Sequence, residues 1–390
     1  MPDQAFRIMP DADAPQNSSV SRLILSQYRS YAALDMALDA QMVVLHGANG
    51  AGKTNILEAL SLLSQGRGLR RADLRECARE GGPGAWSISV EVGHETGAVQ
   101  LGTGFDPLDA AGRKCRIDRA PVSSVAAFAD YVRVVWLTPA MDGLFTGSAS
   151  DRRRFLDRLV LSVDAGHGTR VNALDRALRN RNRLLEDNYA DRVWLDAAER
   201  EVAELGIAVA CARRETVARL VTLILQERDE TSPFPSADLE HSSDMDTLLV
   251  ENPAVIAEEK YREILRNARG RDAAAGRTLI GAHISDLIVH HGPKQMAAAR
   301  ASTGEQKALL TGLVLAHARL VNVMSGLAPL ILLDEIAAHF DPIRRAALFD
   351  QLELCGAQVW MTGADRLSFD NLNGRATFLN VAQSKVEAQK

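Results

Sequence analysis

The sequence contains few cysteines, and none of them stands at a functional spacing. The four cysteines are far apart, and no pair has the C-x-x-C or metal-ligand spacing of a redox motif or a zinc site. We therefore expect reduced structural thiols in a cytoplasmic protein. No apolar run approaches the length of a membrane span, and residues 1–19 lack the basic start and apolar core of a signal peptide. These absences argue against a membrane partner.

An excess of positive charge is also missing. The formal net charge of the 390 residues is −5, which excludes a wholly basic nucleic-acid binder and restricts any DNA contact to local patches. The hydrophobic share of 46% and the charged share of 24% are ordinary for a folded protein. This length allows two domains, or one domain with a large insertion.

What the sequence does contain is a phosphate-binding loop. It fits the pattern G-x-x-x-x-G-K-[ST], between an apolar run at 42–45 and a helical pattern that begins at 55. A chance glycine-rich turn is the alternative, and the flanking strand and helix disfavour it. Glycines let successive N–H groups face one concavity at a helix N-terminus, where phosphate binds well. Lys53 is expected to reach the β- and γ-phosphates of ATP, and Thr54 to give its hydroxyl to Mg²⁺. The predicted ATP-binding residues are Gly47, Ala48, Asn49, Gly50, Ala51, Gly52, Lys53, Thr54 and Asn55.

Two carboxylates follow a second apolar run, at 330–333. Such a run is typical of a parallel strand that is buried on both faces. Asp334 at its end is predicted to hold Mg²⁺ through water, opposite Thr54, as a Walker B aspartate does. Glu335 is placed to take a proton from the attacking water. Lys53, Asp334 and Glu335 are thus the candidate catalytic residues. The alternative is a pair of solvated acids at a strand end, which the phosphate-binding loop upstream disfavours.

A third motif resembles the signature of the ABC ATPases. In that class the signature opens a helix and caps the γ-phosphate of the ATP that is bound by the other subunit, so it predicts an ATP-dependent homodimer with a shared site. Asp341 is then the acid of the D-loop, which follows Walker B and meets the partner subunit. The signature residues are Ser302, Thr303, Gly304, Glu305 and Gln306.

A long helical insert separates these motifs. Lys53 and Asp334 are 281 residues apart (334 − 53), and residues 151–228 contain no proline and carry apolar residues at helical spacing. We expect three or four long amphipathic helices there. Arginines are dense in this region and in the turn at 66–71. Such runs are usually solvated surface, but on an ATPase they are also candidate contacts to DNA phosphates. The candidate DNA-binding residues are Arg67, Arg70, Arg152, Arg153 and Arg154.

These features predict an α/β fold with a mixed sheet and an inserted helical domain, and the arrangement resembles an ABC-type (SMC/RecF-like) ATPase head. Antiparallel strands are expected in the first lobe, including one at 131–137, and a connector at 231–246. The expected boundaries are a disordered tail at 1–19, an N-terminal head lobe at 20–147, the helical insert at 148–275, a C-terminal head lobe at 276–382 and a tail at 383–390.

Several stretches together resemble the RecF family of SMC-like ABC ATPases over about residues 21–377. The resemblance implies an ATP-dependent DNA-binding protein of recombinational repair and replication restart, which dimerises head to head around two ATP molecules and hydrolyses them slowly with Mg²⁺. It also implies binding to duplex DNA and to single-strand/duplex junctions at gaps, and RecA loading with the partners RecO and RecR. The matching stretches are 28–31, 47–60, 66–70, 152–157, 178–185 and 281–287.

The sequence departs from the family pattern in three places. The segment 138–142 keeps a proline without the usual acidic pair after it, and no nearby glutamine identifies a Q-loop residue. Ala282 and Ile284 replace a proline and an arginine, and the loop 337–341 is unusual although Asp341 is retained. The alternatives are another SMC-like ATPase with a nuclease domain or no DNA role, a transporter ATPase subunit, and a scaffold with an inactive site. The short polar tail after Thr377 argues against a nuclease.

Overall fold

The computed structural model describes residues 16–94, 97–109, 112–187, 191–229, 231–336 and 340–389. The chain divides into two compact units, one formed by residues up to 136 together with those from 318 onward, and the other by 137–317. The second unit therefore extends beyond the expected insert at 148–275. Its later part is tied to its helices by direct contacts, such as the ion pair of Arg152 with Asp286 at 2.7 Å.

The first unit is built on a six-stranded mixed sheet with the order β17-β16-β4-β15-β14-β9. Strands β16, β4, β15 and β14 are parallel neighbours, and β17 is antiparallel to β16. Every residue of β4, β9, β14 and β15 is buried, as is typical of parallel strands covered on both faces. The strands are β4 Met42–His46, β9 Val134–Leu137, β14 Leu330–Leu333, β15 Val359–Gly363, β16 Thr377–Ala382 and β17 Lys385–Gln389.

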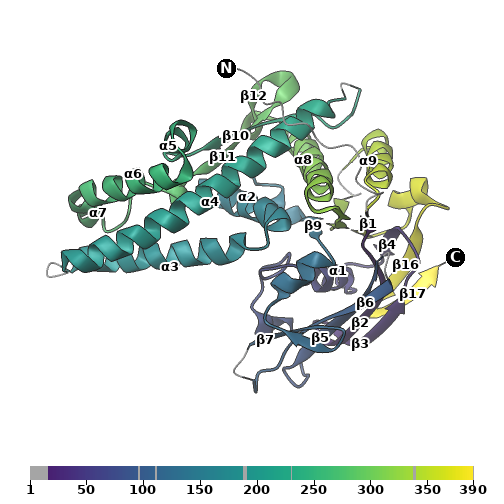
Figure 1. The fold of residues 1–390 in the computed structure, drawn as a ribbon. Coiled ribbons are helices and arrows are strands. Elements are labelled where there is room, and N and C mark those ends of the chain that lie inside the picture. The colour runs from purple at the N-terminus through teal and green to yellow at the C-terminus, as the bar shows by residue number, and fades with distance from the viewer. Residues whose placement is uncertain are drawn as a thin grey trace. The chain divides into compact units, whose positions relative to one another are not determined.

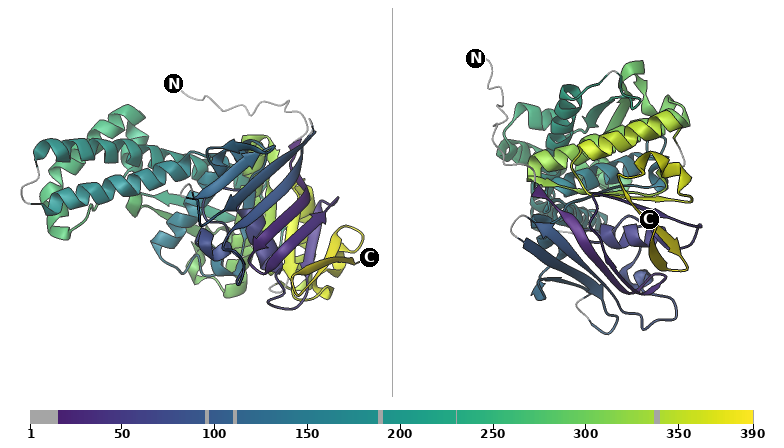
Figure 2. Two further views of the ribbon diagram at one scale, coloured as in Figure 1. Left: turned by 90° about the horizontal axis from the view of Figure 1, so that it is seen from below. Right: turned by 90° about the vertical axis from the view of Figure 1, so that its right-hand side faces the viewer.

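A second sheet of the first unit is antiparallel, with the order β3-β2-β5-β6-β7-β8. Its purple to blue strands lie side by side in the left view of Figure 2. In β2, for example, Leu23 and Leu25 are buried while Arg22, Ile24 and Ser26 are more accessible, as is typical of a strand with one open face. The expected strand at 131–137 does not belong to it, because the fully apolar β9 joins the mixed sheet instead. The strands are β2 Ser19–Tyr28, β3 Tyr31–Ala37, β5 Trp86–His94, β6 Gly97–Phe105, β7 Arg113–Ile117 and β8 Ala120–Val122.

Three helices bear on the nucleotide motifs: α1 Lys53–Ser61, α8 Thr303–Ser325 and α9 Pro342–Leu354. Helix α1 packs against β14 and β15, and α9 connects β14 to the parallel β15 as a crossover. Helix α8 is long and apolar enough to cross a membrane by length and composition alone, contrary to the expectation that no stretch reaches that size. Its most apolar window is 67% buried, as is usual for a core helix.

The second unit combines helices with a small sheet of β10 Ala237–Ser242, β11 Asp286–His291 and β12 Met296–Ala297. Helices α2, α3 and α4 confirm the prediction of three or four long helices, and α3 lies alongside α4 (Figures 1 and 2). The expected connector at 231–246 contains β10, which pairs with β11. The helices are α2 Ala149–Val163, α3 His167–Glu186, α4 Arg192–Gln226, α5 Asp246–Glu251, α6 Ala254–Asn267 and α7 Arg269–Ala275.

Both predicted tails contain short strands. Residues 1–15 lie outside the described part of the chain, but Gln16–Asn17 form β1, which pairs in parallel with β13 Leu327–Ala328. Strand β17 occupies most of the expected tail at 383–390, although its residues are largely exposed. Its polar composition does not indicate a strand, because the strand is stabilised by pairing with β16 and not by burial of its side chains. None of the four cysteines forms a disulfide, and no cluster of potential metal ligands occurs among the described residues.

Candidate nucleotide-binding site

The phosphate-binding loop connects the buried strand β4 to helix α1. Gly47, Gly50 and Gly52 all have positive φ angles, of 142°, 80° and 112°. A Cβ at Gly47 would collide with the carbonyl oxygen of Val381, and one at Gly52 would lie 2.8 Å from the Tyr31 hydroxyl. Conformation and space therefore both require glycine at the two ends of the loop. The result is a tight turn at the N-terminus of a helix, where backbone N–H groups attract anions.

The side chain of Lys53 is buried within this loop. Its Nζ atom donates hydrogen bonds to the carbonyl oxygens of Gly47 and Ala48, at 2.6 and 2.9 Å. Burial lowers the pKa of Lys53, while the negative charges of Glu335 and Asp334 act to raise it. The ammonium thus lies where the loop's concavity would hold a triphosphate, and it can exchange backbone oxygens for phosphate oxygens.

The structure brings Asp334 to the same place. Oδ1 of Asp334 accepts hydrogen bonds from the hydroxyls of Thr54, at 2.9 Å, and Thr362, at 2.7 Å. The Thr362 hydroxyl in turn accepts from the backbone N–H of Glu335 at 2.8 Å. Glu335 has a φ of 52°, a costly conformation for a residue with a side chain and one that is common at functional sites.

Thr362 is a site residue that the motifs did not identify. It lies near the end of β15, the parallel neighbour of β14. No motif surrounds a threonine in this position. Only the strand topology points to Thr362, because the carboxyl ends of adjacent parallel strands meet at one edge of a sheet, where ligands bind.

A buried carboxylate on α1 connects this helix to two arginines near the phosphate-binding loop. Glu58 of α1 is fully buried and accepts hydrogen bonds from Arg29, at 2.7 Å, and Arg70, at 3.1 Å. Burial works to lower the pKa of Arg29, but the hydrogen bond and charge of Glu58 outweigh it and the pKa rises. Arg70 also donates to Asn55 at 2.7 Å. This turn contains two of the predicted DNA contacts, Arg67 and Arg70. Arg70 has internal partners, although its side chain is 40% exposed, and Arg67 is exposed.

In the second unit, the signature opens helix α8. The Ser302 hydroxyl donates to Glu305 at 2.9 Å and accepts from its N–H at 3.4 Å, which is a capping box. Hydrogen bonds from Lys294 and Ser302 lower the pKa of Glu305 to about 2. Gln306 is buried and donates to the carbonyl of Ala301 at 2.9 Å. Ser302, Thr303 and Gly304 are exposed, so the helix N-terminus is open to a ligand.

The three arginines at the start of α2 differ in their surroundings. Arg152 forms a bidentate pair with Asp286, and Arg153 donates to the carbonyl of Ser285 at 2.7 Å. Burial, followed by the charge of Arg213, lowers the pKa of Arg153. Arg154 pairs with Asp151 on the surface. Internal contacts thus hold Arg152 and Arg153, while Arg154 is the most accessible of the three.

The remaining predicted positions lie at loops and helix ends. Asp341 caps α9 by accepting from the N–H groups of Ile343 and Arg344, and its side chain is half exposed. Hydrogen bonding to Arg344 N–H, against a small effect of burial, lowers the pKa of Asp341. The unusual residues 337–339 lie outside the described residues. Ala282 is buried and Ile284 is exposed, in the 3-10 turn Ala282–Ile284.

The phosphate loop follows β4 and the Asp-Glu pair follows β14, two strands of one mixed sheet that are separated by β15. Between the two motifs the sequence contains a helical unit that carries a signature motif. Together these features define an ABC-type ATPase head of the SMC-like class. The family described as "RecF/RecN/SMC N terminal domain" matches residues 19–384. A DNA replication and repair protein RecF of Rhizobium etli (strain CIAT 652) is 53% identical over 373 residues, which cover 95% of this chain and 99% of that protein. The chain belongs to the RecF family of DNA replication and repair proteins.

Two further comparisons agree with this assignment. The RecF protein of Agrobacterium fabrum (strain C58 / ATCC 33970) is 53% identical over 95% of this chain and 98% of its own length. A solved structure described as "the recombination mediator protein RecF-ATPrS in RecFOR pathway" has a TM-score of 0.85 and covers 97% of this chain and all of that one. Its sequence identity is 18%, so this likeness concerns the fold. The predicted fold class and family are confirmed.

Proposed function

We propose that the protein is an ATP-dependent DNA-binding ATPase of recombinational repair and replication restart, which acts as a head-to-head dimer in the cytoplasm. The observation that carries this proposal is the 2.9 Å contact between Thr54 and Asp334. It joins the phosphate loop to the Walker B aspartate across 280 positions of sequence. Family membership supports the cellular role and leaves the transporter alternative without support.

The residues present suit ATP and Mg²⁺. The Thr54 hydroxyl and the Asp334 carboxylate are oxygen donors of the kind Mg²⁺ prefers, and they already touch each other. When bound, Mg²⁺ would neutralise charge on the β- and γ-phosphates. Lys53 binds the same phosphates, and Glu335 takes a proton from the attacking water. Thr362 orients Asp334 through its hydroxyl.

The exposed signature supports the dimer. Ser302, Thr303 and Gly304 are exposed at a positive helix end, which suits the γ-phosphate of an ATP molecule bound by the other subunit. ADP lacks that phosphate, so only ATP would favour the dimer, through its stronger binding to that state. Asp341, at the start of α9, would contact the partner subunit nearby.

The DNA role follows from the family. We propose that the dimer binds duplex DNA and single-strand/duplex junctions at gaps, mainly through phosphate contacts, and promotes RecA loading with RecO and RecR in response to DNA damage. Slow hydrolysis would then release the DNA. Fluorescence anisotropy with a labelled gapped duplex tests this directly. We expect binding with ATP and Mg²⁺ and little binding with ADP; equal binding with both nucleotides would contradict the proposal.

The DNA contacts can be identified from salt dependence. Each phosphate contact contributes about 0.9 to the slope of log K against log salt concentration, so changing Arg67, Arg70 and Arg154 together to glutamine should reduce the slope by about 2 to 3. Arg152 and Arg153 belong to the same proposed group, but their internal contacts make their variants harder to interpret. Arg375→Gln, which removes a surface arginine paired with Asp350, is the control. An unchanged slope in the triple variant would reject these contacts.

Substitution of Thr362 should lower catalysis although the phosphate-binding loop itself is unchanged. Thr362→Val removes the hydrogen bonds to Asp334 and to the Glu335 N–H while keeping the side-chain shape. Loss of such a supporting hydrogen bond typically costs about 10- to 100-fold in metal affinity or activity, so we expect ATP turnover to fall at least about 10-fold and more Mg²⁺ to be needed. Thr362→Ser retains the hydroxyl and should stay near wild type. Equal turnover in the valine and serine variants would show that the hydroxyl has no such role.

A further inference from the structure

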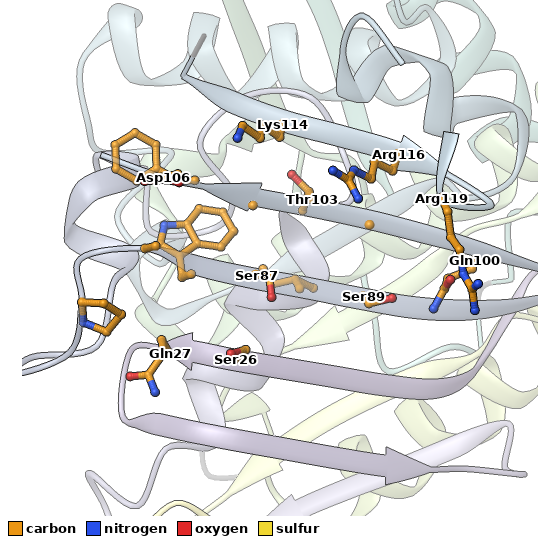
Figure 3. Close-up of a pocket in the computed structure, with 17 residues that line it drawn as sticks. Ser26, Gln27, Ser87, Ser89, Gln100, Thr103, Asp106, Lys114, Arg116 and Arg119 are labelled. Carbon is orange, nitrogen blue, oxygen red and sulfur yellow. The ribbon is translucent and has the colours of Figure 1, made fainter. Parts of the chain in front are cut away.

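A groove outside the nucleotide-binding site crosses the open face of the antiparallel sheet in the first unit. Its volume is about 520 Å³, within the range of pockets that hold small molecules or short peptide segments. Figure 3 shows Lys114, Arg116 and Arg119 along one side of it, with Ser26 and Gln27 on the opposite side. Serines of β5 lie between the two sides (Figure 3).

The basic side of the groove is a row of three cations. Lys114 and Arg116 alternate along β7, so both side chains stand on the open face, about 7 Å apart along the strand. Arg119 stands in the turn after β7, where it and Asp118 have φ angles of 70° and 47°. The Asp118 carboxylate accepts from the N–H of Gln100 at 2.9 Å, which holds this strained turn against β6. Lys114 pairs with Asp109 at 2.6 Å. In the described part of the chain, neither Arg116 nor Arg119 forms an ion pair.

The floor of the groove carries a glycine, with no side chain, at a position where packing does not require glycine. Gly102 stands in register between Ser89 of β5 and Arg116 of β7. A Cβ there would make only an ordinary contact, 3.9 Å from the Cβ of Arg116. By contrast, a Cβ at Gly104 would lie 2.8 Å from the carbonyl oxygen of Trp86, so packing explains that glycine. Glycine within a strand weakens a sheet and often marks a place where a ligand approaches the backbone closely.

Acceptor groups in the groove indicate what kind of anion it binds. Asp106 and the serines of β5 also line the groove, and their oxygens can accept hydrogen bonds from N–H groups of a ligand. A peptide supplies both carboxylates and N–H donors, whereas a phosphodiester backbone supplies only acceptors. Beyond Lys114 the groove is lined by Pro83 and Phe105, which suit an apolar side chain.

We propose that this groove binds an extended acidic segment of a partner protein. Its carboxylates lie against Arg119, Arg116 and Lys114, its backbone crosses the floor at Gly102, and an apolar residue occupies the end at Phe105. All of these residues belong to the first unit and lie outside the phosphate-binding loop. The interaction therefore does not depend on bound ATP.

Fluorescence anisotropy with the full-length protein and no nucleotide tests the proposal. The probe is a labelled hexapeptide of consecutive aspartates followed by leucine and phenylalanine. We expect it to bind the wild type, and to bind at least about 10-fold more weakly to Arg116→Glu/Arg119→Glu, because the charge complementarity is reversed. Gly102→Leu, which fills the floor, should weaken binding similarly. Arg75→Glu changes an exposed arginine of the first unit outside the groove and should bind like the wild type.

Three results would overturn the proposal. The first is failure of the peptide to bind the wild type, and the second is binding of the peptide to the groove variants as tightly as to Arg75→Glu. The third is tighter binding of a labelled single-stranded oligonucleotide than of the peptide, with loss of affinity in the same variants, which would assign the groove to nucleic acid. ATP binding and the unfolding temperature are measured for every variant, so that failure of the groove is separated from failure of the ATPase. If the double variant unfolds, Arg116→Ser replaces it.

Discussion

Replacement of Glu335 with glutamine is expected to slow ATP turnover by at least about 100-fold while ATP still binds, because a general base contributes about 10²- to 10⁴-fold to the rate. Glutamine keeps the shape of the side chain but cannot accept the proton of the attacking water. The backbone N–H at this position donates to Thr362 in either case, so the local geometry should persist. The proposed ATP-bound dimer should then live longer, because hydrolysis is its proposed route of release.

Single-turnover measurements with radiolabelled ATP give the rate, and filter binding gives the affinity. Glu353→Gln is the matched control, since Glu353 is a surface acid of the same unit whose partner Arg375 keeps a second carboxylate, Asp350. If Glu335→Gln turns over ATP at the wild-type rate, or if both variants lose the same share of that rate, Glu335 does not act as the general base.

The second large effect is on stability, at Arg181 in helix α3. This guanidinium is fully buried and donates to Asp272 at 2.8 Å, to Thr278 at 2.7 Å and to the carbonyl of Leu265 at 2.8 Å. It also pairs with the buried Glu199 at 3.3 Å. Arg181→Ala leaves buried carboxylates without this compensation, and breaking a buried pair in this way costs about 3–5 kcal/mol.

Urea unfolding followed by circular dichroism measures this cost. The chain has two compact units, so the transition of the helical unit is fitted separately. Arg176→Ala removes an exposed arginine from the same helix and should change the unfolding free energy by no more than about 0.5 kcal/mol. If the two variants unfold at the same urea concentration, the buried network does not stabilise the unit as described.

The head of the molecule was largely predictable because its motifs are local. The run from β4 through Lys53 and Thr54 contains its strand, turn and helix within a short stretch, and Asp334 follows an apolar run that is typical of a buried strand. The contact between Thr54 and Asp334 follows from the rule that ligands bind at the carboxyl ends of parallel strands.

Other features depend on partners that are distant in sequence. Arg152 stands in a basic run that is typical of a solvated or DNA-binding surface, yet it pairs with Asp286, 134 positions away. Arg181 stands among surface arginines at helical spacing, and only tertiary packing distinguishes it from its neighbour Arg179. Strand β17 is too polar to be recognised, because its backbone pairs with β16 while its side chains face water.

Sedimentation velocity in the presence of different nucleotides tests the central claim most directly. The chain has a mass of 42.3 kDa. With ATP and Mg²⁺ we expect a species of twice that mass, and with ADP the monomer alone, because only ATP presents a γ-phosphate to the partner's Ser302. Ser302→Arg, which blocks the exposed helix end, should stay monomeric with ATP. Identical sedimentation of the wild type in ATP and ADP would contradict a site that is shared between two copies of the chain.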